Sequence, residues 1–227
     1  MRRSLPAMLC VALALMVATL VHACPTSLIW IPCTDIQESH SLCLGLSHYR
    51  PADPDDYFTD LYATYGVSDR VEVGLDWLLD EPHPLSFNAK ALLLQDDAHH
   101  PALAVGLMGF GTRRDMTDYN IAYLLLAQTF GRARVTAGYG RGNRGALGVD
   151  PDILLLGLDG YLDRAEQWWW CVDYESGKNS WGALSFGVSH PVGARGSLTV
   201  GFNRYNDRTL GDTLYLGAGW KIGGKGK

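Results

Sequence analysis

Four polar residues on two neighbouring predicted strands are the first candidates for chemistry in this sequence. Glu72 and Asp76 share one face of a strand, and Asn88 and Lys90 lie on the strand that follows. Two carboxylates at such a spacing can serve as general acid and general base. Inside a barrel the same four residues form a lumen charge network, and this is the interpretation that we adopt.

These two strands, predicted over 70–80 and 85–95, are expected to form a hairpin. Directly opposed residues of a hairpin have Cβ atoms ~5 Å apart, close enough for side chains of opposite charge to meet. A register that keeps both alternations in phase predicts three opposed pairs: Asp76 with Lys90, Trp77 with Ala89, and Leu75 with Ala91.

A serine and a histidine stand next to each other at Ser189 and His190. The run 187–191 begins like the nucleophile elbow of a serine hydrolase, but the motif requires glycine where Pro191 stands. Consecutive residues of a strand point to opposite faces, so His190 cannot act as the base for Ser189. We expect no enzyme, and a barrel hydrolase is the least favoured alternative.

The run 140–145 satisfies the spacing G-x-G-x-x-G of dinucleotide-binding loops. That motif needs a following helix whose free N–H groups hold the pyrophosphate. Residues 146–152 contain no helix start, so we interpret the run as a basic outer loop and expect no cofactor.

Two histidines, His99 and His100, follow Asp96 and Asp97 in a short connection. Imidazole and carboxylate groups suit several divalent ions. Two adjacent histidines in a short loop rarely close a metal site, so we predict a polar turn without a metal.

The first residues have the pattern of a secretory signal peptide. Two arginines precede an apolar stretch at 5–21, and a small-residue cleavage pattern follows it. The stretch is shorter than the ~20 residues of a spanning helix. We expect export through the Sec pathway and cleavage between Ala23 and Cys24.

Cys24 would then begin the mature chain, after a run that resembles a bacterial lipoprotein box. Lipid attachment at Cys24 and ordinary cleavage both stay open. Cys33, Cys43 and Cys171 would accompany it in an oxidising compartment, and no spacing among them matches a zinc site. A bridge from Cys24 to Cys33 is one alternative, and the sequence does not determine the pairing.

The charge balance excludes one class of partner. The whole chain has a formal net charge of -5, and the signal peptide removes two of its arginines. Nucleic-acid binding needs clustered Lys and Arg that release counterions from phosphates. The mature chain has no such cluster, so we expect no nucleic-acid partner.

The rest of the chain is patterned as strands. Around 70–80, Val71, Val73, Leu75 and Trp77 alternate with polar residues, as the two faces of a strand require. Turn formers separate twelve such segments. They are predicted at 40–50, 57–66, 70–80, 85–95, 102–110, 119–130, 133–140, 153–162, 167–175, 181–189, 197–205 and 213–222, and a count of ten is the alternative.

A membrane barrel explains this pattern better than a soluble sandwich. Short connections such as 67–69 and 131–132 alternate with longer ones such as 141–152, as inner turns and outer loops do in outer-membrane barrels. Runs such as 102–107 have one face of small residues, which suits a narrow lumen. Aromatic residues near strand ends suggest headgroup girdles: Trp77, Trp168, Trp170, Trp181, Trp220, Tyr62, Tyr65, Tyr123, Tyr139 and Tyr215.

The run 66–76, followed by 88–90 and 101–106, resembles a hairpin-and-strand pattern of uncharacterised bacterial outer-membrane barrels, including those similar to the exopolysaccharide-associated YjbH type. Residues 173–177 echo it. The resemblance implies the fold and the location, and it carries no catalytic residues. The ending after Trp220 departs from the terminal aromatic usual in such barrels.

The sequence therefore predicts a signal peptide (1–23), an N-terminal lead-in (24–39), an antiparallel transmembrane β-barrel (40–222) and a short basic tail (223–227). Its partners would be outer-membrane lipid and the barrel-insertion machinery. The expected role is a small channel or a structural or envelope-assembly component. An exported soluble or lipid-anchored barrel that binds a small ligand is the alternative.

Overall fold

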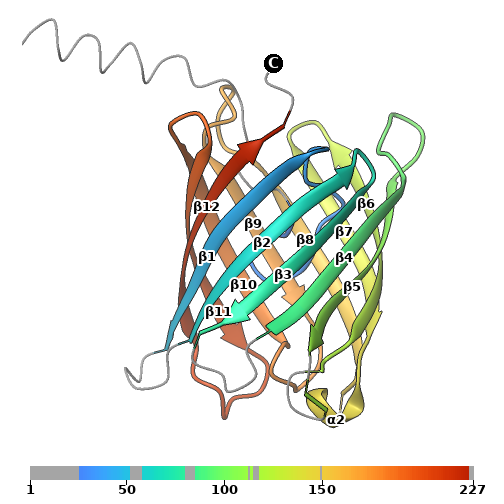
Figure 1. Cartoon of the computed structure of the whole chain (residues 1–227), viewed down its shortest axis with the longest axis vertical. Helices are drawn as coiled ribbons and strands as arrows, with labels where there is room; N and C mark the ends of the chain where they lie inside the picture. The colour runs from blue at the N-terminus through green and yellow to red at the C-terminus, as the bar shows by residue number, and fades with distance from the viewer. Residues whose placement is uncertain are drawn as a thin grey trace, which may run out of the picture.

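The computed structural model describes residues 26–51, 58–79, 85–111, 113–114, 118–148 and 150–224. In these residues twelve antiparallel strands close into one barrel, in which each strand pairs with its neighbours in the chain and β1 pairs with β12 (Figure 1). The strands are β1 Ser41–Pro51, β2 Phe58–Ser68, β3 Val71–Leu78, β4 Leu85–Leu94, β5 Ala102–Gly111, β6 Ile121–Phe130, β7 Ala133–Arg141, β8 Asp152–Tyr161, β9 Trp169–Glu175, β10 Ala183–Val192, β11 Gly196–Tyr205 and β12 Thr213–Gly223.

The predicted alternation is confirmed on β3. Val71, Val73, Leu75 and Trp77 project outward with 36–51 % of their surface exposed, whereas Glu72 on the inner face is 6 % exposed. The same period of two holds on most strands, because successive side chains of a strand point to opposite faces. The β4–β5 pairing departs from it at two register shifts, between Phe87 and Ala89 and between Leu92 and Leu94. The twelve predicted segments match the twelve strands, with ends displaced by only a few residues.

An apolar belt covers the outside of the barrel. A soluble monomer rarely exposes a contiguous apolar surface of this extent, whereas a bilayer requires it. The belt therefore identifies a membrane-spanning barrel and argues against the soluble alternative. Its members include Leu44, Leu61, Val73, Phe87, Leu107, Leu124, Val135, Leu156, Phe186, Val200 and Leu216.

The two ends of the barrel differ. β1 begins where β12 ends, and this end has the short turns 69–70, 131–132 and 193–195, with longer connections at 95–101 and 162–168. The opposite end has the connections after the odd-numbered strands, among them 142–151. Short turns mark the periplasmic end of outer-membrane barrels. We call it the turn end and the opposite one the loop end.

The predicted basic loop contains one turn of helix, α2, over Arg144–Leu147. The Asn143 side chain caps it by accepting a hydrogen bond from the Gly145 N–H, an interaction that the sequence reading did not include. Four residues cannot hold a pyrophosphate in the way of a dinucleotide-binding helix. No helix among the described residues is long and apolar enough to cross a membrane.

The girdle prediction is wrong for three tyrosines and one tryptophan, because Tyr62, Tyr123 and Tyr215 face the lumen and Trp181 packs against the buried inner cluster. Tyr62 stands directly across from Gly45, where an added Cβ would come within 2.1 Å of the ring. Tyr123 has the same relation to Gly106. A glycine on the neighbouring strand thus leaves room for an inward ring. Trp77, Trp220, Tyr65 and Tyr139 do face outward.

Candidate functional site: a plugged lumen

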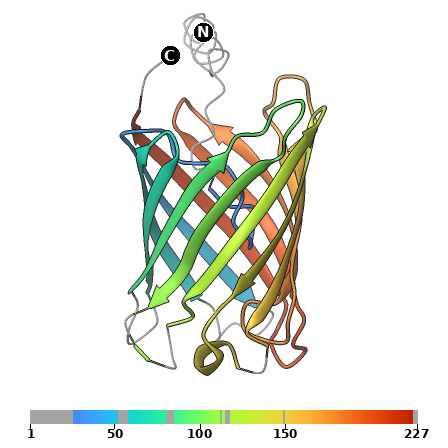
Figure 2. The same cartoon turned by 90° about the vertical axis from the view of Figure 1, so that its right-hand side faces the viewer.

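The segment that precedes β1 lies inside the barrel (Figure 2). Residues 26–33 form a small hairpin, in which Leu28 N donates to Ile31 O at 2.9 Å and Cys33 N donates to Thr26 O at 3.3 Å. The chain then runs to the turn end, where His40 N donates to Gly66 O. We call residues 26–40 the plug and Leu28–Ile31 its tip. The sequence analysis placed a lead-in here without assigning it a position.

Glycines of the wall form a seat for the tip. An added Cβ at Gly157 on β8 would lie 2.5 Å from Leu28 Cδ1, and one at Gly187 on β10 would lie 2.2 Å from Ile29 Cδ1. Any side chain at these positions would overlap the tip, so the missing side chains create the space that the tip fills.

The wall beside the tip is apolar on β6 and β8. Ile121, Leu125, Ile153 and Leu155 have no exposed surface and belong to one cluster with the tip. Full burial of an aliphatic side chain stabilises by ~1.5–3 kcal/mol. Three tip side chains, those of Leu28, Ile29 and Ile31, are buried, so seating the tip contributes roughly 5–9 kcal/mol as an upper estimate. Burial of these side chains therefore favours the seated position of the tip in the lumen.

Two wall residues of opposite charge bind the plug on both sides of its tip, at Thr26 and at Gln37. Lys90 Nζ on β4 lies 3.1 Å from Glu72 Oε1 on β3. The ammonium also donates to Thr26 O at 2.8 Å, and Glu72 Oε2 accepts the Gln37 N–H at 2.6 Å. We call this pair the first latch. Each charge is thereby satisfied by its partner and by plug backbone.

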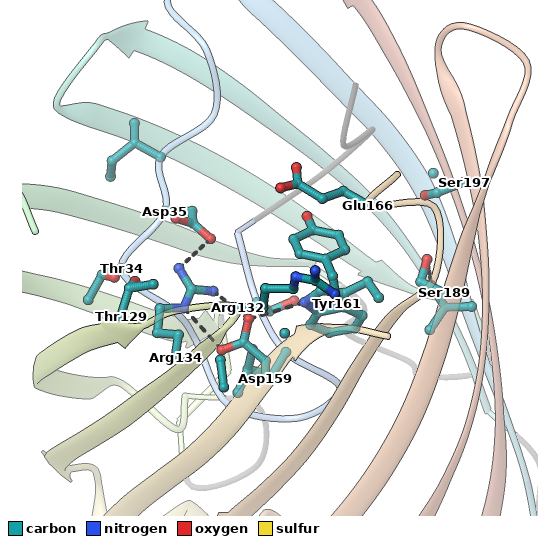
Figure 3. Close-up of a pocket in the computed structure, with 18 of the residues that line it drawn as sticks. Thr34, Asp35, Thr129, Arg132, Arg134, Asp159, Tyr161, Glu166, Ser189 and Ser197 are labelled. Carbon is teal, nitrogen blue, oxygen red and sulfur yellow. Dashed lines mark hydrogen bonds and ion pairs between the residues drawn. The ribbon is translucent and has the colours of Figure 1, made fainter. Parts of the chain in front are cut away.

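A second latch lies at the turn end (Figure 3). Arg134 on β7 donates from Nη1 to Asp35 Oδ2 of the plug at 2.7 Å, and from Nε and Nη2 to the two oxygens of Asp159 on β8 at 3.0 Å. Trp169 Nε1 also donates to Asp159 Oδ2. A forked guanidinium–carboxylate contact is both stronger and more directional than a single-point ion pair.

A third latch holds the tip. Asp173 Oδ2 on β9 accepts the backbone N–H groups of Ile29 at 2.8 Å and Trp30 at 3.1 Å. The Trp30 ring meets Tyr49 and Tyr205 edge-on, and its indole N–H donates to Trp181 O. The Asp173 carboxylate and the aromatic contacts of Trp30 thus hold the turn of the hairpin in place, on the side of the lumen nearer the loop end.

The predicted pairing of Asp76 with Lys90 is wrong. The β3–β4 register sets Lys90 opposite Glu72 and Asp76 opposite Ser86, and Asp76 accepts hydrogen bonds from Ser86 and Asn88. Trp77 accordingly pairs with Leu85 and Leu75 with Phe87. Both registers keep the same faces inward, because alternation has a period of two and cannot distinguish registers that differ by an even shift.

The four residues predicted as a lumen network all face the lumen, but they form two separate groups. Glu72 and Lys90 bind the plug, whereas Asp76 and Asn88 bind each other. Asn88 stands opposite Gly74, which has no side chain, and its amide can therefore reach Asp76.

A cavity of about 720 Å³ remains between the plug and the wall at the turn end (Figure 3). Arg134 and Asp159 line one side, and hydroxyl groups of β10 and β11 line the other. It contains acceptors, donors and aromatic rings, a mixture that suits small polar solutes. Its polar lining includes Thr34, Asp35, Arg132, Tyr161, Gln167, Trp169, Ser189, Ser197 and Thr199.

Ser189 and His190 do not meet. Ser189 Oγ donates to Leu198 O and accepts from Thr199 Oγ1, while the His190 ring packs against Trp168 with centroids 4.5 Å apart. Each side chain is engaged elsewhere, so the geometry provides no serine–base pair at this position.

The histidine turn is organised by Asp97. Its Oδ1 accepts the backbone N–H groups of His99 at 2.7 Å and His100 at 2.9 Å, and these hydrogen bonds lower the pKa of Asp97. Throughout the described ranges, no three His, Cys, Asp or Glu side chains gather in a way that could hold a metal ion.

The cysteines fall into two kinds. Cys33 and Cys171 are buried thiols, which rules out the bridge from Cys24 to Cys33 in this structure. Cys43 is disulfide-bonded. The predicted cleavage site, Ala23 and Cys24, lies outside the described residues.

Neither a scan against protein-family models nor a search of curated proteins finds a match. Among solved structures, the chain is similar to the KdgM porin in complex with disordered oligogalacturonate, with a TM-score of 0.59 and 10 % identity over 80 % of this chain and 99 % of the porin. It also aligns with the Acinetobacter baumannii outer membrane protein Omp33, with a TM-score of 0.46 and 12 % identity over 82 % and 99 % of the two chains. At 10 % identity the likeness to the porin shows the fold alone, that of an outer-membrane β-barrel.

Proposed function

We propose that this transmembrane barrel is an outer-membrane channel for small polar solutes, held closed by its own plug. One observation carries the proposal: the plug is bound by wall side chains of β3, β4, β7 and β9, and its tip rests in a seat of glycines. Because the plug fills the lumen through noncovalent contacts, its withdrawal would open a path through the barrel.

The charges of the lumen favour neutral or cationic solutes. Three basic residues on the inward faces of the strands already pair with carboxylates: Lys90 with Glu72, Arg134 with Asp159 and Asp35, and Lys221 with Glu38. Arg132, in the turn between β6 and β7, adds a basic side chain to the cavity lining. Asp60, Asp76 and Glu175 add carboxyl groups that have no basic partner among the described residues. A polyanion such as the oligogalacturonate of the KdgM complex would meet like charge here.

The resemblance to exopolysaccharide-associated barrels supports uncharged oligosaccharides as the first solutes to test. The polar cavity at the turn end, with Tyr161 and Trp169 in its lining, offers rings and hydroxyl groups of the kind that sugars contact. The YjbH type itself is a proposal that rests on the sequence pattern.

Location and assembly complete the proposal. The apolar belt would lie in outer-membrane lipid after export through the Sec pathway. The barrel-insertion machinery would be the partner of the barrel during assembly. No nucleic-acid partner and no enzymatic activity form part of the proposal.

A structural or envelope-assembly role is the second candidate, and the apolar wall favours it. Withdrawing the tip would expose Ile121, Leu125, Ile153 and Leu155 to water, which a channel that opens often would avoid. In that role the plug acts as a permanent core.

Swelling of proteoliposomes in isosmotic sugar separates the two roles. We expect slow swelling with the intact mature chain, and swelling at least tenfold faster with a variant that lacks residues 26–38. Heat-modifiable migration on a gel confirms that both chains are folded. If both chains are folded and their proteoliposomes swell equally slowly, the channel proposal is refuted and the structural role is supported.

A further inference from the structure

A cluster of buried oxygen atoms without hydrogen-bond donors lies on β9, β10 and β11. Glu175 has no exposed surface, and neither of its carboxylate oxygens has a hydrogen-bond partner among the described residues. Asn203 is equally buried, and its Oδ1 has no partner, while its amide group donates to Thr213 Oγ1. Such groups are rare in native structures and call for an explanation.

The strand register brings these residues together. Ser185 on β10 stands directly opposite Asp173 on β9 and directly opposite Asn203 on β11. Glu175 is two residues beyond Asp173, on the same inward face. Figure 1 shows β9, β10 and β11 side by side in the wall. Two carboxylates, an amide oxygen and a hydroxyl therefore share one patch of the lumen near the loop end.

The patch contains two carboxyl groups without a balancing cation. No ion pair joins Asp173 or Glu175 to a Lys, Arg or His among the residues that the structure describes; the pairs that exist lie elsewhere. A buried carboxylate is stable only when it is protonated, paired or bound to a cation. Oxygen atoms alone, both charged and neutral, are the ligands that hard cations such as Ca²⁺ prefer.

We propose that Glu175, Asp173 and Asn203 form a binding site for a hard cation behind the tip of the plug. Asp173 would connect the site to the plug, because Oδ2 holds the backbone of Ile29 and Trp30 while Oδ1 has no hydrogen-bond partner. A cation bound at Oδ1 would keep the carboxylate ionised and in place, which favours the seated tip. The site would take an inorganic cation irrespective of whether the barrel conducts solutes.

Ca²⁺ is the probe that tests the site. The folded mature chain in detergent is stripped with chelator, and Ca²⁺ binding is then measured by titration calorimetry together with the midpoint of thermal unfolding. We expect one bound ion per chain and a midpoint that rises with Ca²⁺ concentration, since a ligand that binds the folded state stabilises it. The variant Glu175→Gln should weaken Ca²⁺ binding at least tenfold and lose the shift.

Asp76→Asn is the matched control, because it removes a lumen carboxylate that already has Asn88 and Ser86 as donors. It should bind Ca²⁺ like the unmodified chain. If Glu175→Gln fails to fold, Asn203→Ala provides the same comparison through a neutral ligand. Absence of Ca²⁺ binding, or equal binding by Glu175→Gln and the unmodified chain, would overturn the proposal and assign a protonated carboxyl group to Glu175.

Discussion

Lys90 and Glu72 face each other across β3 and β4 at 3.1 Å, and each also binds a backbone atom of the plug. Both side chains are almost completely buried, so neither charge is compensated by water. Removing one partner of a buried pair typically costs ~3–5 kcal/mol, whereas removing both costs much less.

We therefore predict that Lys90→Met lowers the free energy of unfolding by ~3–5 kcal/mol, and that adding Glu72→Gln restores a large part of it. Urea unfolding in lipid vesicles, followed by tryptophan fluorescence, measures both variants. A double variant less stable than Lys90→Met alone would show that Glu72 is not stranded by the loss of Lys90.

Ile29 and Gly187 define the seat of the tip. The Cβ of Gly187→Val would stand within 2.2 Å of Ile29 Cδ1, so we predict that this variant unseats the tip. The readout is alkylation of Cys33, a plug thiol with no exposed surface, by a maleimide and peptide mass spectrometry. We expect labelling at least tenfold faster than in the unmodified chain.

The second substitution Ile29→Ala serves as the control for Gly187→Val, because it removes the atoms that would collide. It should return Cys33 labelling toward the original rate. Labelling of Gly187→Val at the unmodified rate would mean that the wall moves instead of the plug.

Leu75 and Asp76 test the orientation of β3. Leu75 projects outward in the middle of the strand and Asp76 projects inward. An arginine facing lipid at mid-bilayer costs ~2–4 kcal/mol, so Leu75→Arg should reduce the yield of heat-modifiable barrel strongly while Asp76→Asn changes it little. Equal yields would contradict the assignment of the two faces.

Cys43 tests the start of the mature chain. It is disulfide-bonded, and Cys33 and Cys171 are thiols. Removal of residues 1–23 would leave Cys24 as the remaining cysteine, so we predict a mature chain that begins at Cys24 and a bridge from Cys24 to Cys43. Peptide mapping without reduction measures both. A lipid-modified Cys24 would exclude the bridge, and peptides from residues 1–23 would refute the cleavage.

The barrel was predictable from the sequence because each strand carries its own evidence. On β3 the alternation of Val71, Glu72, Val73 and Gly74 predicts both a strand and which of its faces is apolar. Turn-forming residues indicate where the strand ends. Closure is expected from an even strand count with alternating connection lengths, and the structure decides between the counts of twelve and ten. Strand positions and turns depend on local sequence, and the structure confirms them, whereas the outward placement of Tyr62, Tyr123 and Tyr215 is wrong.

The plug and the register were not predictable in the same way. The run Leu28–Ile31 is too short to show a period, and its position depends on Gly157 and Gly187, far away in the sequence. A signal did exist, since the apolar run Leu28–Ile31 and the glycines at inward strand positions both need a packing partner. The predicted β3–β4 register is wrong because alternation is compatible with two registers. Lys90 faces the lumen whether it stands opposite Asp76 or opposite Glu72.

The closure of the lumen by the plug is tested most directly by single-channel conductance in planar bilayers. We compare the unmodified chain with Ile29→Asp, which places a charge in the apolar seat, and with Ile36→Asp, the same change at a half-buried plug position that lines the cavity. We predict a closed barrel for the unmodified chain and for Ile36→Asp, and long-lived openings for Ile29→Asp. Equal conductance in all three, whether open or closed, would contradict the seated tip as the gate.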